Sequence, residues 1–492
     1  MALDCDSCFP RLRWELNELQ RKDYNDRGLL VHGLLMRKYF VFALVALPVF
    51  LGNVGSTSVA VAFPTMVSHF GTSLVVSGWV LSIYMLTAIG TIPITSKLSD
   101  TLGRRSTFML CLAAFIVGSF LCAIAPNIGW LIFFRVIQAA GGGGFTSAVT
   151  GIVSDQMPDK RQQSIGLLSS VGNIGAIVGP NIGGAMVHSL GWQSVFWLNV
   201  PLGIVVLVLT RVFIKADIKK GSYKDLDFLG GGLLVGFVSA VMISLTLMGK
   251  TYHVPLVVIV PILLLGVFFL VVFVRRSRNS PDAVVPRQLL TRRPFLAANL
   301  FNFIYGTCGQ NGIMALMPLY GASVYGMSAI ESGLMLTPRS FGVVAASITS
   351  SMFLLKWGYR RPIMAGTLGI AFGLIVMALE PSGMALFGMS LPPIAVVMVL
   401  AAFVGIGAGL VNPAANNACI ELMPDKVASI TGLRQVVRQM GGSIGIAVST
   451  LVLQSSTDMA QGFLFVYMGS SVILLMSIPI VFFMPRGPQA TR

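Results

Sequence analysis

Long apolar runs, each bounded by charged residues, divide the chain between residues 39 and 484. The hydrocarbon layer of a bilayer is about 30 Å thick, so one helical crossing needs about 20 apolar residues, and the runs have this length. Only helices and closed barrels span bilayers, and runs this rich in Leu, Met and Gly do not alternate like barrel strands. The pattern therefore predicts an all-α polytopic membrane protein. Its fourteen predicted spanning helices cover residues 39–63, 77–96, 106–125, 128–152, 163–188, 193–213, 226–248, 254–274, 294–319, 329–352, 361–379, 393–420, 428–453 and 461–484.

The charged residues follow the same division. Of the 492 residues, 55% are hydrophobic and 11% are charged, and the formal net charge is +16. With the N-terminal tail placed in the cytoplasm, 29 of the 34 Lys and Arg residues fall in the tails and cytoplasmic loops, while the outer loops hold only Lys250. This positive-inside distribution predicts a multi-pass protein of the inner (plasma) membrane with both termini cytoplasmic. Because the membrane accounts for the basic charge, no nucleic-acid partner is expected.

An internal repeat relates residue n to residue n + 266. Residues 157–160 recur as residues 423–426, and five further identities follow in register, including Gly175 with Gly441 and Gly179 with Gly445. The matched helices are the fifth and the thirteenth, so we predict a duplicated six-helix unit with two helices inserted between the copies, a 6+2+6 arrangement. Parallel halves of this kind place a substrate cavity near the membrane midplane. The predicted parts are a cytoplasmic tail (1–38), a first bundle (39–213), a linker with two helices (214–280) and a second bundle with a short tail (281–492).

Two motifs of the first half resemble those of a transporter family. The loop after the second predicted helix reads Ser96-Lys-Leu-Ser-Asp100-Thr-Leu-Gly103-Arg104-Arg105, and the fifth helix contains Gly175-Ala-Ile-Val-Gly179-Pro180-Asn-Ile-Gly183-Gly184. These segments resemble the G-x-L-a-D-r-x-G-r-r and G-x-x-x-G-P-x-x-G-G motifs of the major facilitator superfamily, specifically its fourteen-helix drug:proton antiporter family of EmrB/QacA type. The resemblance implies the major facilitator fold. Ser96 stands where the loop motif has its first glycine.

Both motifs are expected to act in conformational change. Gly103 permits a tight turn, and Asp100 can accept hydrogen bonds from a helix terminus or an arginine and so form a cytoplasmic latch. A solvated loop is the alternative explanation. Glycines four residues apart on the fifth helix allow close helix approach, and Pro180 kinks that helix. The predicted gating residues are Ser96, Asp100, Gly103, Arg104, Arg105, Gly175, Gly179, Pro180, Gly183 and Gly184.

Four arginines lie within predicted helices, where insertion scales assign an arginine a cost of about 2.5–3.5 kcal/mol. They are expected to face a cavity or a partner rather than lipid. Arg434 and Arg438 share one helix face, and their repulsion is tolerable only near water, an anion or backbone carbonyls freed at a broken helix. Arg135 and Gln138 also share a face, in a segment that resembles the family motif L-x-x-x-R-x-x-Q-G. The predicted substrate-cavity residues are Arg135, Gln138, Arg339, Arg434 and Arg438.

The first predicted helix departs from the family pattern. Residues 54–64 correspond to the family sequence L-D-x-T-x-x-N-V-A-L-P, but Gly55 stands in the position of the membrane aspartate. All 18 acidic residues fall in tails, loops or helix ends, which argues against proton coupling through a central carboxylate. The candidates for proton coupling are Asp155, Glu331 and Glu421, although a surface charge is the alternative explanation for each.

The resemblance implies secondary active export of a small amphiphilic compound by alternating access and proton antiport, and some relatives work with a membrane-fusion partner protein. Efflux of an organic anion or metabolite without a central carboxylate is the main alternative, and a non-transporting membrane sensor is a third. The sequence shows no nucleophile–base pair and no cluster of metal ligands, so we expect neither an enzyme nor a cofactor or metal site. The expected partners are the lipid bilayer, an amphiphilic substrate and protons.

Overall fold

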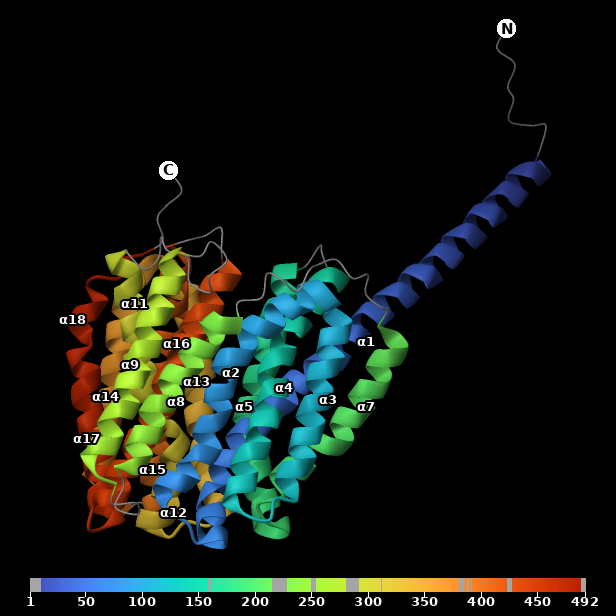
Figure 1. Ribbon diagram of the computed structural model, residues 1–492. Coiled ribbons are helices and arrows are strands. Elements are labelled where there is room, and N and C mark those ends of the chain that lie inside the picture. The colour runs from blue at the N-terminus through green and yellow to red at the C-terminus, as the bar shows by residue number, and fades with distance from the viewer. Residues whose placement is uncertain are drawn as a thin grey trace.

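The computed structural model shows an almost wholly helical protein, and the predicted all-α polytopic membrane class is confirmed (Figure 1). The structure describes residues 10–157, 161–214, 228–248, 254–279, 292–310, 312–379, 385–386, 389–390, 392–422 and 427–487. For residues 10–37, and for Ser96 and Asp100 among others, only the backbone is described.

Following the predicted repeat, we group the helices into two bundles with an inserted pair between them in sequence. The first bundle consists of α1 (Pro10–Phe70), α2 (Leu74–Leu102), α3 (Arg104–Ala123), α4 (Ile128–Gln156), α5 (Arg161–Leu190), α6 (Ser194–Trp197) and α7 (Asn199–Phe213). The inserted pair is α8 (Phe228–Leu247) and α9 (Leu256–Asn279). The second bundle consists of α11 (Arg293–Ile304), the π-helix η4 (Tyr305–Gln310), the 3₁₀-helix η5 (Met314–Leu316), α12 (Met317–Tyr325), α13 (Ala329–Trp357), α14 (Arg360–Ala378), α15 (Pro393–Ile420), α16 (Val427–Ser455), α17 (Met459–Met476) and α18 (Ile478–Val481). Two short strands, β1 (Ala385–Leu386) and β2 (Met389–Ser390), pair antiparallel between α14 and α15.

Within the described residues, eleven helices are long and apolar enough to cross a membrane. The other three predicted crossings, 163–188, 294–319 and 329–352, coincide with α5, the broken segment α11–α12, and α13. These segments are rich in glycine and polar residues, or are interrupted, so composition alone does not mark them as spans. The count of fourteen remains a prediction.

The predicted helix at 294–319 is broken, so the prediction of one continuous helix there was wrong. Helix α11 ends at Ile304, the π-helix η4 follows, and the Gly312 N–H bonds the Gly306 carbonyl at 3.0 Å instead of continuing a regular helix. A Cβ at Gly306 would lie 2.3 Å from the Arg438 carbonyl oxygen. Close approach to the α16 backbone therefore requires glycine at this break, and interrupted membrane helices commonly border transport sites.

The predicted tail does not end where a helix begins. Helix α1 starts at Pro10 and continues without interruption to Phe70, so residue 38 is not a helix boundary. Its N-terminal part projects beyond the bundle in Figure 1. The sequence boundary at residue 38 marks where the helix becomes apolar, and the helical backbone itself extends across it.

The bundle has two ends, which we name by their composition. The basic face is the end that carries the α2–α3 turn, the α13–α14 turn and residues 484–487, together with the ends of α7 and α9 and the starts of α8 and α11 (Figure 1). The opposite face carries the α1–α2 and α16–α17 turns. Basic residues of the described turns and helix ends, such as Arg104, Arg105, Arg211, Lys356 and Arg360, therefore gather at this end, as the charge pattern predicts.

The two bundles meet along α2 with α16 and along α5 with α13. The Ser443 hydroxyl reaches the Ser82 carbonyl at 3.4 Å, and the Thr337 hydroxyl donates to Asn181 Oδ1 at 2.8 Å. The Val75 N–H donates to Gln454 Oε1 at 3.4 Å. Each of these bonds lies in the half of the bundle nearer the opposite face.

The inserted pair covers the α2–α16 contact. Helix α8 packs on both α2 and α16, and the Trp79 indole N–H donates to the Thr246 hydroxyl at 2.8 Å. Helix α9 packs on α8 and exposes a run of large apolar side chains, as expected for a lipid-facing helix. The pair is thus attached to the side of the protein, at the contact between the bundles.

Candidate substrate site and conformational contacts

Arg434 is held by a ring of asparagine oxygens in the second bundle. Its Nε donates to Asn302 Oδ1 at 3.0 Å, its Nη1 to Asn416 Oδ1 at 3.4 Å and its Nη2 to the Asn412 carbonyl at 3.4 Å. The side chain is 6% exposed. The protein itself therefore satisfies all three guanidinium nitrogens of Arg434, and its role in the fold is to join α11, α15 and α16.

Arg438 lies one turn further along α16 and takes different acceptors. Its Nη1 donates to Asn412 Oδ1 at 3.3 Å and its Nη2 to Gln435 Oε1 at 2.6 Å. Amide oxygens carry only a partial charge, so they reduce the repulsion between Arg434 and Arg438 without neutralising either cation. Within the described residues no carboxylate reaches this cluster, which keeps a net positive charge.

Arg339 of α13 completes the cluster. None of the described residues supplies a hydrogen-bond acceptor to its side chain, and its Nε is buried. It lies ten residues from the start of α13, which places it about 15 Å below the opposite face, inside the membrane. The hydroxyl of Tyr305 lies within electrostatic range of Arg339, Arg434 and Arg438. That hydroxyl makes only a long bond, 3.5 Å, to the Ala408 carbonyl.

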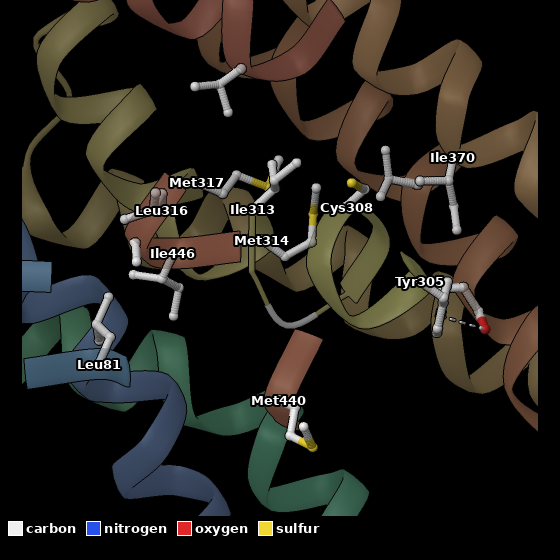
Figure 2. Close-up of a cluster of buried hydrophobic side chains, with 14 of the residues drawn as sticks. Leu81, Tyr305, Cys308, Ile313, Met314, Leu316, Met317, Ile370, Met440 and Ile446 are labelled. Carbon is white, nitrogen blue, oxygen red and sulfur yellow. Dashed lines mark hydrogen bonds between the residues drawn. The ribbon is translucent and has the colours of Figure 1, made fainter. Parts of the chain in front are cut away.

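An apolar, sulfur-rich cluster adjoins these cations. Figure 2 shows Tyr305, Cys308, Met314 and Met317 of the broken segment together with Met440 of α16, all of them buried. Leu81 of α2 and Ile446 of α16 belong to the same cluster, which therefore bridges the two bundles (Figure 2). Methionine side chains adapt to varied apolar shapes. A cationic group of residues beside a deformable apolar one is suited to an amphiphile with a negative or carbonyl-bearing end.

The asparagines of this site were not anticipated from sequence. Asn412 and Asn416 lie four residues apart on α15, a strongly apolar helix, and Asn302 lies on α11. Polar residues at this spacing in a strongly apolar helix share one face, which is a usable signal. What the sequence could not supply was the contact, since the three residues come together only when α11, α15 and α16 pack.

Arg135 is placed inside the first bundle. Its Nε donates to the Val80 carbonyl of α2 at 3.1 Å, and its Nη1 donates to Gln138 Oε1 at 2.6 Å. Its guanidinium carbon lies 4.5 Å from the centre of the Tyr84 ring, and the side chain is 3% exposed. Gln138 in turn donates to Ser119 on α3 at 2.8 Å. These contacts show the partners that the sequence required for Arg135, and they tie α2, α3 and α4 together.

The glycine motif of α5 faces two different helices, α1 and α13. Gly175, Gly179 and Gly183 face α1, where a Cβ at Gly179 would lie 2.0 Å from the Thr57 hydroxyl. The Ser58 hydroxyl donates to the Gly179 carbonyl at 2.8 Å. Gly184 instead faces the other bundle, where its Cβ would lie 2.6 Å from the Ala329 carbonyl.

Pro180 belongs to the inter-bundle side of the motif. Its carbonyl oxygen would lie 2.3 Å from a Cβ at Gly333 of α13. Gly184 of α5 and Gly333 of α13 have no side chains, so they let the α5 and α13 backbones approach each other closely.

The loop motif forms a tight turn at the basic face. Gly103 has φ +94°, in the region that favours glycine, between α2 and α3. Arg104 pairs with Asp155 and donates to the Gly151 carbonyl at 2.5 Å, both near the end of α4. Arg105 donates to the Arg211 carbonyl on α7 at 2.9 Å. The side chains of Ser96 and Asp100 lie outside the described residues.

The three candidate proton-coupling carboxylates all lie at helix ends. Asp155 pairs with Arg104, and Glu421, at the end of α15, accepts from the Tyr359 hydroxyl at 3.1 Å. Glu331 caps the start of α13, where its Oε2 accepts from the Ser328 N–H at 2.8 Å. That backbone hydrogen bond lowers the pKa of Glu331. Each carboxylate thus has a partner that holds a helix end.

The chain can be compared with known proteins at this point. It is 28% identical over 434 residues to the multidrug transporter protein MdtP of Bacillus subtilis, covering 87% of this chain and 76% of that protein. It is 29% identical to the multidrug resistance protein B homolog of Mycobacterium tuberculosis, with coverages of 82% and 74%. A bacterial homolog of the human lysosomal transporter Spinster, in an inward-facing and unoccupied conformation, has a TM-score of 0.66 at 17% identity and covers 91% of this chain and 96% of its own. Residues 45–225 and 228–446 match the Major Facilitator Superfamily as a family. This chain is therefore a membrane transporter, not an enzyme, and belongs to the Major Facilitator Superfamily.

Proposed function

We propose that this transporter exports a small amphiphilic compound whose polar end is an anion or a carbonyl-bearing group. The observation that carries this proposal is Arg339, a cation at membrane depth that has no hydrogen-bond acceptor among the described residues. A guanidinium desolvated without an acceptor is costly, so a ligand that supplies one is favoured there. Arg438 and Tyr305 are the adjacent groups that would share such a ligand. The Met-rich cluster beside them would accept the apolar end.

Alternating access between the two bundles is the proposed mechanism. The division into bundles 39–213 and 281–492, with the linker 214–280, follows the repeat and the grouping of the helices. The inter-bundle hydrogen bonds lie toward the opposite face. With the basic face in the cytoplasm, as the positive-inside rule assigns it, this is the arrangement of an inward-facing state. The proposed location is the plasma membrane, with both termini cytoplasmic.

Export of an organic anion needs no central carboxylate. A potential that is negative inside favours the exit of an anion by about 2.3 kcal/mol per charge and 100 mV. The partners of Asp155, Glu331 and Glu421 at helix ends support this mode. Proton antiport with multidrug specificity is the second candidate, supported by the names of the relatives and the resemblance to the EmrB/QacA type. A membrane-fusion partner protein belongs to that second candidate.

Transport by purified protein in liposomes tests the proposal. Anionic and cationic amphiphiles of matched size are offered, with either a membrane potential or a pH gradient imposed. Arg339→Gln is expected to raise the KM for anionic compounds about tenfold or more, because a charge-assisted hydrogen bond contributes about 1.5–3 kcal/mol. Arg339→Lys keeps the charge but loses the two-pronged guanidinium donor. Its KM is expected to lie between that of the wild type and that of Arg339→Gln.

The matched control is Lys356→Gln, which removes one exposed cation from the basic end of the same helix. It is expected to leave the KM unchanged. A normal KM of the Arg339→Gln protein for every anionic compound would contradict the proposed contact between Arg339 and the substrate. Transport of anions driven by the pH gradient alone, and not by the potential, would favour proton antiport instead.

A further inference from the structure

Each bundle has a glycine-containing turn at the basic face. In the first bundle the α2–α3 turn contains Gly103 at φ +94°, and in the second the α13–α14 turn contains Gly358 at φ +68°. Each glycine precedes the first residue of the next helix or its cap, so both turns reverse the chain at the same place in the six-helix unit. A positive φ at each glycine permits the reversal.

In the first bundle this turn contacts the ends of two other helices. Arg104 reaches Asp155 and Gly151 near the end of α4, and Arg105 reaches the Arg211 carbonyl near the end of α7. The turn between the second and third helices is thereby attached to the ends of the fourth and the last helix of the bundle.

The second bundle makes the corresponding contacts with different chemistry. The Tyr359 hydroxyl donates to Glu421 Oε2 at the end of α15. The Tyr359 N–H donates to the Arg486 carbonyl at 3.0 Å, just beyond α18. Arg360 donates to the Met484 carbonyl through Nε at 2.9 Å and Nη2 at 2.6 Å.

The repeat makes the correspondence specific. Glu421 is the residue that the n + 266 register pairs with Asp155, and the two carboxylates accept from the residue that follows the turn glycine in their own bundle. In the first bundle that residue is Arg104 and the contact is ionic. In the second it is Tyr359, and the carboxylate accepts from a neutral hydroxyl. The C-terminal segment takes the place of the α7 carbonyl.

We propose that Tyr359, Arg360, Glu421 and the backbone of residues 484–486 form a second clamp, equivalent to the one around Arg104, that keeps the second bundle rigid while the bundles move against each other. Tyr359 and Arg360 are positioning residues for transport. They lie at the basic face, away from the proposed substrate contacts. The clamp makes the C-terminal segment part of the transport machinery.

The protonation state of Tyr359 supports the arrangement. Burial and the neighbouring Glu421 carboxylate raise the pKa of the Tyr359 hydroxyl. The hydroxyl therefore remains a donor throughout the physiological pH range. A raised pKa also agrees with a hydroxyl that faces a negative group in a partly dehydrated place.

A double-mutant cycle with Tyr359→Phe and Glu421→Ala tests the contact. Each single change is expected to lower the maximal transport rate about fivefold, the effect of one lost hydrogen bond, with KM unchanged. Because the two groups act through each other, the double variant is expected to be no slower than either single one. Additive losses in the cycle would overturn the clamp, and so would loss of transport on Glu421→Ala with a normal rate for Tyr359→Phe, which is the result a proton-coupling role predicts.

Two truncations test the C-terminal part. Ending the chain after Phe483 removes the Met484 and Arg486 carbonyls, whereas ending it after Gly487 keeps both and serves as the control. Spin labels at Lys356→Cys and Leu296→Cys, both exposed on the second bundle, report its rigidity directly. The distance distribution is expected to broaden with the shorter chain and with Tyr359→Phe, and to stay narrow in the control.

The clamp proposal rests on bundle motion but not on the substrate. Unchanged distance distributions in both Tyr359→Phe and the shorter chain would overturn it. If the shorter chain does not reach the membrane, the Tyr359→Phe distribution decides the matter alone. Failure to transport anions would contradict the proposed function, but the spin-label distances would still test the clamp.

Discussion

At the scale of single residues, the membrane arginines differ in what the protein supplies to them. Arg135 and Arg434 are enclosed by backbone carbonyls and amide oxygens, and their contacts join neighbouring helices. Arg339 has no acceptor among the described residues. The same residue type at similar depth therefore joins helices in two positions and is the proposed ligand contact in the third.

The cap formed by Ser328 and Glu331 at the start of α13 is expected to contribute stability that depends on pH. Hydrogen bonds from Ser328 lower its pKa, so the cap stabilises the protein above the ordinary carboxyl pKa, and this contribution is lost as the pH falls through the lowered value. Glu331→Gln is expected to lower the thermal unfolding midpoint at neutral pH, with the difference from wild type disappearing in acid. Unfolding scans in detergent across pH would measure it. If Glu331→Gln instead abolished the pH dependence of transport, the carboxylate would be a coupling group and not a cap.

At the scale of helices, the α5 motif packs against two different helices. Gly179 packs α5 onto α1 within the first bundle, and Gly184 meets α13 across the contact between the bundles. The two glycines look equivalent in sequence, but a larger side chain is expected to disturb folding at one and the conformational equilibrium at the other. Helix packing without a hydrophobic driving force depends on such close approach.

Gly184→Val is accordingly expected to open the opposite face. Its side chain would displace the Ala329 carbonyl, separate α5 from α13 and favour the outward-facing state. Ser82→Cys, buried against the other bundle, would report this as faster labelling by a membrane-impermeant thiol reagent added from outside. Gly469→Val is the control, because no atom lies within 4 Å of a Cβ built there. Equal labelling rates in the two variants would show that this contact does not close the opposite face.

At the scale of the whole molecule, the proposed alternating access requires the bundles to separate where they now touch. Gly78 of α2 lies against Thr450 of α16, with 3.0 Å between a Cβ built at Gly78 and the Thr450 Cγ2 atom. The inserted helix α8 covers this contact and bonds α2 through Trp79. A covalent link here would hold the opposite face closed.

The paired change Gly78→Cys and Thr450→Cys is expected to form a disulfide on mild oxidation, because a Cβ at residue 78 would lie 3.0 Å from the Thr450 Cγ2 atom, whose place a cysteine sulfur could take. Oxidation is expected to stop transport and a reductant to restore it, while either single cysteine variant should be insensitive. Flux in liposomes and gel mobility measure the two effects. Full transport by the cross-linked protein would exclude separation at this contact as a step of the cycle.

The sequence by itself determined the features that depend on local composition and on comparison along the chain. Hydrophobic runs determined the membrane class and most helix positions, because a bilayer demands a fixed length of apolar helix from each crossing. The repeat and the motifs indicated the superfamily and located the turn at Gly103 and the glycines that pack α5. The arginines were identifiable because charge is rare at that depth.

Only the tertiary structure decided which groups meet. The break after Ile304 depends on the α16 backbone beside Gly306, and the same packing brings Asn302 to Arg434 from 132 positions away in sequence. No local pattern shows that Arg434 has acceptors among the described residues while Arg339 has none, because that difference depends on which oxygens the neighbouring helices bring close. Hydrogen bonds and close packing act over a few ångströms between helices that are remote along the chain, so the site exists only once those helices are assembled.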